Sequence, residues 1–148
     1  MYQVPSEVAP LEWAWVDGQL TSTGCFWVVA PTLAHPHPRP VWGVWFEETL
    51  ALSLGSPRLR ADLPEGTDVT VHLPSDTDVV VVEGTVSGHT VDEIWIERYD
   101  EKYDWDYDVR RYGPLTLVAP RKVMAWRSAG WAGREGFRAT GRWRFATP

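Results

Sequence analysis

Residues 36–46 read PHPRPVWGVWF, a proline-rich segment that leads directly into an apolar and aromatic run. The run Val41–Phe46 has the length and composition of a buried β-strand. Arg39 stands at its start, where a guanidinium is costly to bury unless an anion meets it. Trp42 is flat and Gly43 has no Cβ, so the pair leaves room for a planar ring. The stretch therefore predicts a strand that carries a site for a phosphate and an aromatic ligand.

Apolar runs separated by turn residues continue on both sides of this strand. Glu47-Glu48 is short enough to close a hairpin with the next run. Val79–Val82 is apolar at every position, which indicates a strand buried on both faces. The other predicted strands are Cys25–Ala30, Thr49–Leu54, Asp68–Leu73, Asp78–Val86, Leu115–Ala119, Val123–Arg127 and Arg142–Phe145.

Two helices are predicted beside these strands. Pro10 suits the first turn of a helix, and a capping box at Thr90–Glu93 predicts the start of another. Apolar residues at helical spacing give each helix one buried face. These faces are Leu11, Trp15, Val16 and Leu20 in the first helix and Val91, Ile94, Trp95 and Tyr99 in the second.

Many short strands with two helices predict a mainly β chain that forms a small β-barrel with peripheral helices. Closure into a barrel removes the exposed strand edges that promote aggregation. A β-sandwich is the alternative. The chain has 148 residues and no linker-like stretch, so one domain over residues 1–148 is expected.

Composition narrows the possible partners and the compartment. The net charge is −6 and the pI about 5.1, which argues against nucleic acid as a partner. No apolar run approaches the ~20 residues that span a bilayer, and the N-terminus lacks the pattern of a secretion signal. A cytoplasmic location without membrane contact is expected, and the single cysteine, Cys25, fits a reducing compartment.

An anion site is predicted where the hairpin returns the chain. If the strands beginning at Val41 and Thr49 pair, Arg39 comes close to the loop that holds Arg58 and Arg60. The hydroxyls of Ser53 and Ser56 then add donors to the same phosphate. The alternative is a solvated loop with surface arginines.

Other kinds of site find little support in the residues. His35 and His37 have no metal-ligating partner at a telling distance, so no metal is predicted. No catalytic nucleophile, acid or base is identified, so any chemistry falls to a cofactor. The ten tryptophans permit a sugar-stacking platform, as in carbohydrate-binding modules, but strand and helix patterns account for most of them.

Segments spread over nearly the whole chain match one known pattern: Phe26–Val29, Pro36–Trp45, Leu50–Ser53, Val69–Leu73, Val79–Gly84, Tyr99–Trp105, Met124-Ala125-Trp126 and Arg142–Phe145. Together they resemble the pyridoxamine 5′-phosphate oxidase-like flavin-binding split barrels. Tyr99–Trp105 is similar to that family's "YxxKYxW" helix end, and Met124-Ala125-Trp126 is similar to one of its closing strands.

The resemblance implies a homodimer of split β-barrels, each with six to eight strands and two or more peripheral helices. It also implies that FMN, or the deazaflavin F420, binds in a groove between subunits. By position, Arg39, Pro40, Val41 and Trp42 lie along the ring and ribityl chain, Ser53, Leu54, Ser56, Arg58 and Arg60 approach the phosphate, and Trp126 and Trp143 approach the ring from the partner subunit.

The chain departs from the family pattern in the loop after the third strand. Residues 54–63 are shorter than the family's "TGPxSRKxRNL" loop and contain no lysine, which weakens or rearranges the phosphate site. The C-terminal signature of true pyridoxamine phosphate oxidases is absent.

The leading hypothesis is a redox protein that passes hydride between its cofactor and a small organic substrate. In this hypothesis, residues 130–136 are expected to act as a cover over the cofactor site. The alternative is a non-catalytic carrier or sensor for flavin or another planar ligand.

Overall fold

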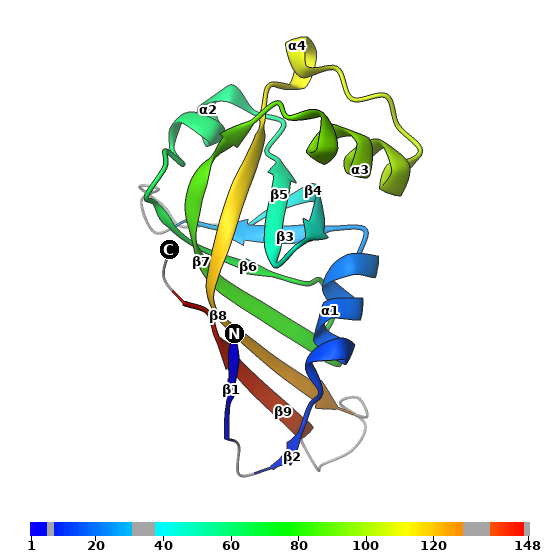
Figure 1. The fold of residues 1–148 in the computed structure, drawn as a ribbon, viewed down its shortest axis with the longest axis vertical. Coiled ribbons are helices and arrows are strands. Elements are labelled where there is room, and N and C mark those ends of the chain that lie inside the picture. Colours follow the sequence, from blue (N-terminus) through cyan, green and yellow to red (C-terminus); the bar gives the residue numbers. More distant parts are fainter. Residues whose placement is uncertain (6–7, 31–37, 129–136, 147–148) are drawn as a thin grey trace.

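The computed structural model describes residues 1–5, 8–30, 38–128 and 137–146 (Figure 1). Within them, six strands close into a barrel in the order β8-β5-β4-β3-β6-β7, and β7 pairs with β8 to complete the ring. The barrel strands are β3 (Phe26–Val29), β4 (Arg39–Phe46), β5 (Thr49–Ser53), β6 (Asp68–His72), β7 (Asp78–Thr90) and β8 (Leu115–Ser128). The predicted mainly β barrel is confirmed.

Three further strands extend the sheet beyond the barrel. The edge of β8 pairs with β9 (Phe137–Arg144), which in turn pairs with β1 (Tyr2–Val4) and β2 (Ala9–Pro10). Pro10 thus lies in a strand, and the first helix begins three residues later than its predicted start. The prolyl nitrogen has no hydrogen to donate, which suits this edge position.

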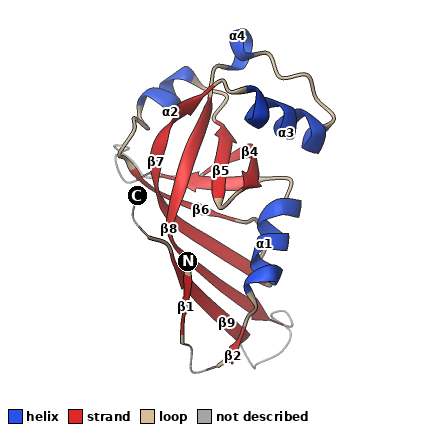
Figure 2. Ribbon diagram, viewed as in Figure 1, coloured by secondary structure: helices blue, strands red, loops and turns tan. Residues whose placement is uncertain are grey.

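Helices surround the barrel, as Figure 2 shows. They are α1 (Trp13–Ser22), α2 (Pro57–Ala61), α3 (Glu93–Tyr103) and α4 (Val109–Tyr112). In Figure 1, α3 and α4 lie at one end of the molecule and β9 with β2 at the other. Among the described residues, no helix is both long and apolar enough to cross a membrane.

The start of α3 differs from the predicted capping box. Thr90 is the last residue of β7, and its hydroxyl accepts a hydrogen bond from the Asp92 amide at 3.0 Å. Asp92 holds the N-cap position without a side-chain cap. Val91 and Ile94 are 58% and 47% exposed, so only the later part of the predicted apolar face is covered.

Two predicted strands near the C-terminus are one long strand, β8. Pairing with β7 shifts register where Glu83 faces Lys122 and Gly84 faces Pro120, so Arg121 is an extra residue. Such a bulge accepts a proline that would otherwise break the ladder. A continuous β8 lets β5, β7 and β9 all pair with it, and this closes the barrel.

The main core fills the barrel. Phe26, Leu50, Leu52 and Val80 are completely buried, and α1 adds Val16 to the same cluster. A second cluster lies between the barrel wall and the α3–α4 segment; it contains Val44, Ala51, Tyr99, Tyr107 and Leu115. This second cluster positions the aromatic side chains of the site described next.

Candidate functional site

A cavity of about 290 Å³ opens where β4 begins and β5 ends. We call it the aromatic pocket. Five predicted site residues line it: Pro40, Val41, Trp42, Ser53 and Leu54. They meet because β4 and β5 pair antiparallel, with Trp42 opposite Ser53. The other lining residues are Gly55, Tyr99, Trp105, Tyr107 and Tyr112.

Trp42 forms an aromatic wall of the pocket. Its indole stacks on Tyr103 with ring centroids 4.7 Å apart and meets Trp105 edge-on at 6.0 Å. Trp42 and Trp105 each remain 46% exposed. Because Tyr103 covers one face of the indole, the exposed remainder offers a flat surface to a ligand.

Tyr103 holds this wall in place. Its hydroxyl accepts a hydrogen bond from the Gly43 amide at 3.0 Å and lies 2.9 Å from the Gly43 carbonyl oxygen. Burial raises the pKa of Tyr103, so its hydroxyl stays protonated and remains a donor. The indole of Trp42 therefore rests on a ring that is fixed to the backbone of the next residue in β4.

Gly43 serves a different purpose from the predicted one. A Cβ at this position would lie 2.7 Å from the Ala51 carbonyl oxygen and 2.7 Å from Leu52 Cδ2. The missing side chain thus makes room for strand β5, and the interpretation that it makes room for a planar ring is wrong.

Hydroxyl groups converge on the opposite wall. The Tyr107 hydroxyl donates to the Gly113 carbonyl at 2.9 Å, so at 3.3 Å the Ser53 hydroxyl is the donor to Tyr107. Ser53 also contacts the Tyr99 hydroxyl. Burial is the main cause that raises the pKa of both Tyr99 and Tyr107. The pocket therefore presents neutral phenols and an alcohol.

The loop between α3 and α4 is what brings Tyr107 to the pocket. The Tyr107 amide donates to Asp100 Oδ1 at 2.8 Å, and Asp104 ends α3 with a positive φ of 48°. Sequence reasoning did not identify Tyr107, Tyr112, Tyr99 or Trp105 as site residues. Two signals were available: the similarity of Tyr99–Trp105 to the family's helix end, and the density of tyrosine and tryptophan in the acidic loop that follows α3.

The predicted phosphate-binding residues are spread along and beside α2. The Ser56 hydroxyl caps α2 by accepting from the Leu59 amide at 3.3 Å. Arg60 Nη1 donates to the Tyr112 carbonyl at 3.3 Å, while Arg58 and Arg39 are exposed. The convergence of Arg39, Arg58 and Arg60 on one phosphate stays a prediction. Because Arg39 is exposed, its guanidinium has no burial cost that an anion would need to offset.

Trp126 and Trp143, the two tryptophans predicted to approach a cofactor ring, have different surroundings. Trp143 is 1% exposed and packs against Trp13 in the core, so it offers no surface to a ligand. Its place contradicts the expected contact with a cofactor. Gly141 has no Cβ because the Trp143 ring occupies that space.

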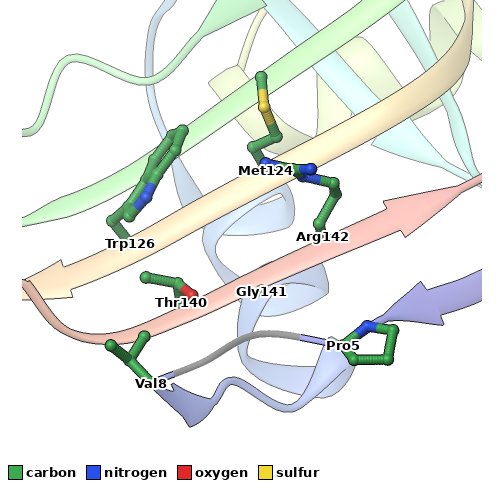
Figure 3. A pocket seen from close by; sticks show the side chains of 7 residues that line it. All are labelled: Pro5, Val8, Met124, Trp126, Thr140, Gly141 and Arg142. Atoms are coloured by element: carbon green, nitrogen blue, oxygen red, sulfur yellow. The ribbon is translucent and has the colours of Figure 1, made fainter.

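Trp126 lines a second cavity, of about 480 Å³, on the outer face of β8 and β9. Figure 3 shows Trp126 and Met124 on β8, Thr140 and Arg142 on β9, and Val8 from the N-terminal segment around it. We call this the ribbon pocket. His35, His37 and residues 130–136 lie outside the described residues. We therefore base the candidate site on the aromatic pocket, where hydroxyls and rings converge.

Comparison with known proteins places the fold. No family model matches the chain, and no curated protein matches it in sequence. Among solved structures, it is similar to an FAD binding protein from Mycobacterium smegmatis, with a TM-score of 0.59 and 16% identity over 92% of this chain and 98% of that one.

Two other solved structures are similar. An FAD and heme binding protein from Mycobacterium smegmatis has a TM-score of 0.54 and 17% identity over 100% of this chain and 76% of that one. A provisionally assigned pyridoxamine 5′-phosphate oxidase from Listeria innocua has a TM-score of 0.54 and 16% identity over 78% and 95%. The split-barrel fold implied by the resemblance is confirmed.

Proposed function

We propose that the aromatic pocket binds the ring of a flavin-type cofactor and that the protein is a flavin- or deazaflavin-dependent oxidoreductase. One observation carries the proposal: the partly exposed Trp42 lines one cavity together with Ser53 and Tyr99. The sequence singled out Trp42 and Ser53 as site residues. The FAD binding named for two proteins of the same fold supports it. When bound, such a cofactor supplies hydride transfer to or from a small organic substrate.

The chain's own residues orient the ring. Trp42 and Trp105 give two aromatic surfaces set at 84° to one another. Ser53 and Tyr99 give neutral polar atoms of the kind that fix the orientation of a ligand in an apolar pocket. None of the pocket's described lining residues carries a charge, so the phosphate of FMN or the tail of F420 must reach beyond it, toward α2.

The direct test is a titration of the purified protein with FMN, FAD, F420 and lumiflavin, the bare ring system. We expect saturable quenching of tryptophan fluorescence and a shift of the visible absorbance of the ligand. Trp42→Ala should weaken the binding of all four by about tenfold, since stacked aromatic contacts contribute about 0.5–1.5 kcal/mol beyond buried area. Trp15→Ala, on α1 outside the pocket, is the control. Absence of binding by every flavin at micromolar concentration would overturn the proposal.

Arg39 distinguishes a phosphate contact from a structural role. Arg39→Ala should weaken the binding of FMN more than that of lumiflavin, because only FMN carries the anion. An equal loss for both ligands would show that Arg39 does not contact the phosphate.

The second candidate is a carrier or sensor that binds a flavin without turnover. The observation that favours it is the hydrogen bond that Arg60 Nη1 donates to the Tyr112 carbonyl, which leaves fewer donors for a phosphate. To distinguish the oxidoreductase from the carrier, the bound cofactor is reduced anaerobically, candidate acceptors are added, and the rate of reoxidation is measured. A bound cofactor that no acceptor reoxidises faster than free flavin would favour the carrier.

We also propose that the protein is a homodimer joined through the outer face of β7 and β8. Val80 and Val82 are buried in the barrel, whereas Val79 and Val81 point outward and stay partly exposed. Cross-strand pairing sets Val79 beside Trp126 and Val81 beside Met124, so the outward residues form one apolar surface. Because β7 is apolar on both faces, its outward face is buried if a second copy of the chain packs against it.

A further inference from the structure

Another cavity, of about 340 Å³, adjoins the aromatic pocket on the side of the α3–α4 loop. Trp105 and Tyr112 line both cavities, so these two residues form a shared wall. We call this cavity the loop cavity; its other lining residues are Asp104, Asp106, Asp108 and Arg111. A molecule bound in the loop cavity therefore lies next to a ring held in the aromatic pocket.

Aromatic residues of the loop cavity provide one means of attracting a cation. Trp105 is 46% exposed, so part of its indole is open to a ligand. Tyr112 already has a cation near its ring, because the guanidinium of Arg111 lies 5.3 Å from the ring centre. The π-electrons of indole and phenol attract organic cations such as alkylammonium groups. The shared wall therefore suits a cationic ligand independently of any carboxylate.

The carboxylates of the loop cavity favour the same class of ligand. Asp104, Asp106 and Asp108 are exposed, and within the described part of the chain none of them forms an ion pair. Arg111 is the one basic residue among the described lining residues. Three carboxylates and one guanidinium give the cavity a negative formal charge, which attracts cations and repels anions.

The basic residues near the aromatic pocket belong to other elements. Arg58 and Arg60 lie on α2, and Arg39 begins β4. The aromatic pocket lies between α2 and the α3–α4 loop, because Gly55, just before α2, lines it together with Trp105. The sign of the charge thus changes across the pocket, from basic at α2 to acidic at the α3–α4 loop. A ligand with an anionic tail is oriented with that tail toward α2, and the loop cavity is left for a second molecule.

We propose that the loop cavity binds the substrate of the ring site and that this substrate is an alkylammonium compound. The assignment rests on the proposed function, because it takes the aromatic pocket as the place of the flavin-type ring. The cation lies against Trp105, with its positive charge close to Asp104 and Asp106. The shared wall brings the substrate beside the ring, and the same carboxylates reject anionic substrates.

The test is a calorimetric titration of the purified full-length protein with choline and with 3,3-dimethylbutan-1-ol, a neutral isostere that has carbon in place of the nitrogen. Choline should bind at least about tenfold more tightly, because only the cation gains from the rings and the carboxylates. Its affinity should also fall as salt is added, since salt screens exposed charges. Equal affinity for the two compounds, or no binding of choline at millimolar concentration, would overturn the proposal.

Two double variants that change the net charge equally separate local contacts from net charge. Asp104→Asn with Asp106→Asn should weaken choline binding by about fivefold. Asparagine tolerates the φ of 48° at residue 104, and Asp108 is retained because its side chain caps α4. Glu65→Gln with Asp76→Asn removes two exposed charges outside the cavity lining and should leave choline binding unchanged. An equal loss in both double variants would contradict the proposal.

Titration with choline in the presence of lumiflavin separates the cation site from the ring site. Saturation with lumiflavin should leave choline binding intact or strengthen it, because the ring and the cation occupy adjoining cavities. Competition between the two ligands would overturn the proposal. Binding of lumiflavin without choline would contradict the cation site alone, whereas binding of choline without any flavin would support the cation site and contradict the proposed function.

Discussion

Single residues decide how closely the strands of the barrel approach. Gly43 lies where a Cβ would collide with the backbone of β5, while Gly18 on α1 has nothing within 4 Å of the same position. The local sequence does not show which of the two glycines packs against another strand. Only the pairing of β4 with β5 separates the glycine that packing requires from the one that could be replaced.

Substitution of these two glycines should change the free energy of unfolding in opposite directions. Gly43→Ala should destabilise the protein by about 1–3 kcal/mol, because the added methyl overpacks the contact with Ala51 and Leu52. Gly18→Ala should stabilise it by about 0.5–1 kcal/mol, because alanine favours the helix. Urea unfolding measures both, and a neutral Gly43→Ala would mean that β4 and β5 are less closely packed than described.

The phenols of the pocket give a signature in alkali. Burial raises the pKa of Tyr99, Tyr103 and Tyr107 in the folded chain. Their contribution to stability is therefore complete below pH 10, the usual value for tyrosine, and is lost as the pH rises above it and the unfolded chain ionises.

Absorbance at 295 nm should show the three tyrosines ionising together with unfolding. Tyr107→Phe should remove one of them from the transition and destabilise the protein by about 1–2 kcal/mol near pH 8, because Ser53 loses its acceptor and the Gly113 carbonyl its donor. Gradual ionisation of all three in a protein that stays folded would contradict the burial of the cluster.

At the scale of elements, local patterns predicted most of the fold. The alternating and apolar runs located β3 to β6 and the first part of β7, because these runs are bounded by turn residues. Strand β7 continues beyond its predicted end at Val86 to Thr90. The patterns failed where a long-range contact decides the outcome. The bulge at Arg121 joins two predicted strands into β8, and the α3–α4 loop becomes a pocket wall only through Asp100 and Ser53.

The β4–β5 hairpin carries strain that can be relieved. Glu47 and Glu48 have φ values of 46° and 54°, the left-handed region that a two-residue turn of this type requires. Glutamate is unfavourable there, so the double substitution Glu47→Asn and Glu48→Gly should raise the free energy of unfolding by about 1 kcal/mol. Thermal and urea unfolding would report it, and an unchanged midpoint would show that the turn is not strained.

At the scale of the whole molecule, Val79–Val82 leaves apolar side chains on the outer face of the barrel. Val79–Val82 is predicted to be buried on both faces of its strand, but only Val80 and Val82 are buried, and Val79 and Val81 stay partly exposed. The outward residues adjoin Met124 and Trp126, which line the ribbon pocket. Local sequence does not show which of the valines point outward or that Trp126 lies beside them, because both depend on the register of β7 against β8.

The proposed dimer predicts that a charge on this face separates the subunits. Trp126→Glu should convert a dimer to a monomer in sedimentation velocity at micromolar concentration, because the carboxylate would be buried without a partner in the interface. Ile94→Glu changes an exposed apolar residue on α3 and should leave the dimer intact. If the native protein sediments as a monomer, or if Ile94→Glu separates the subunits while Trp126→Glu does not, the outer face of β7 and β8 is not where two copies meet.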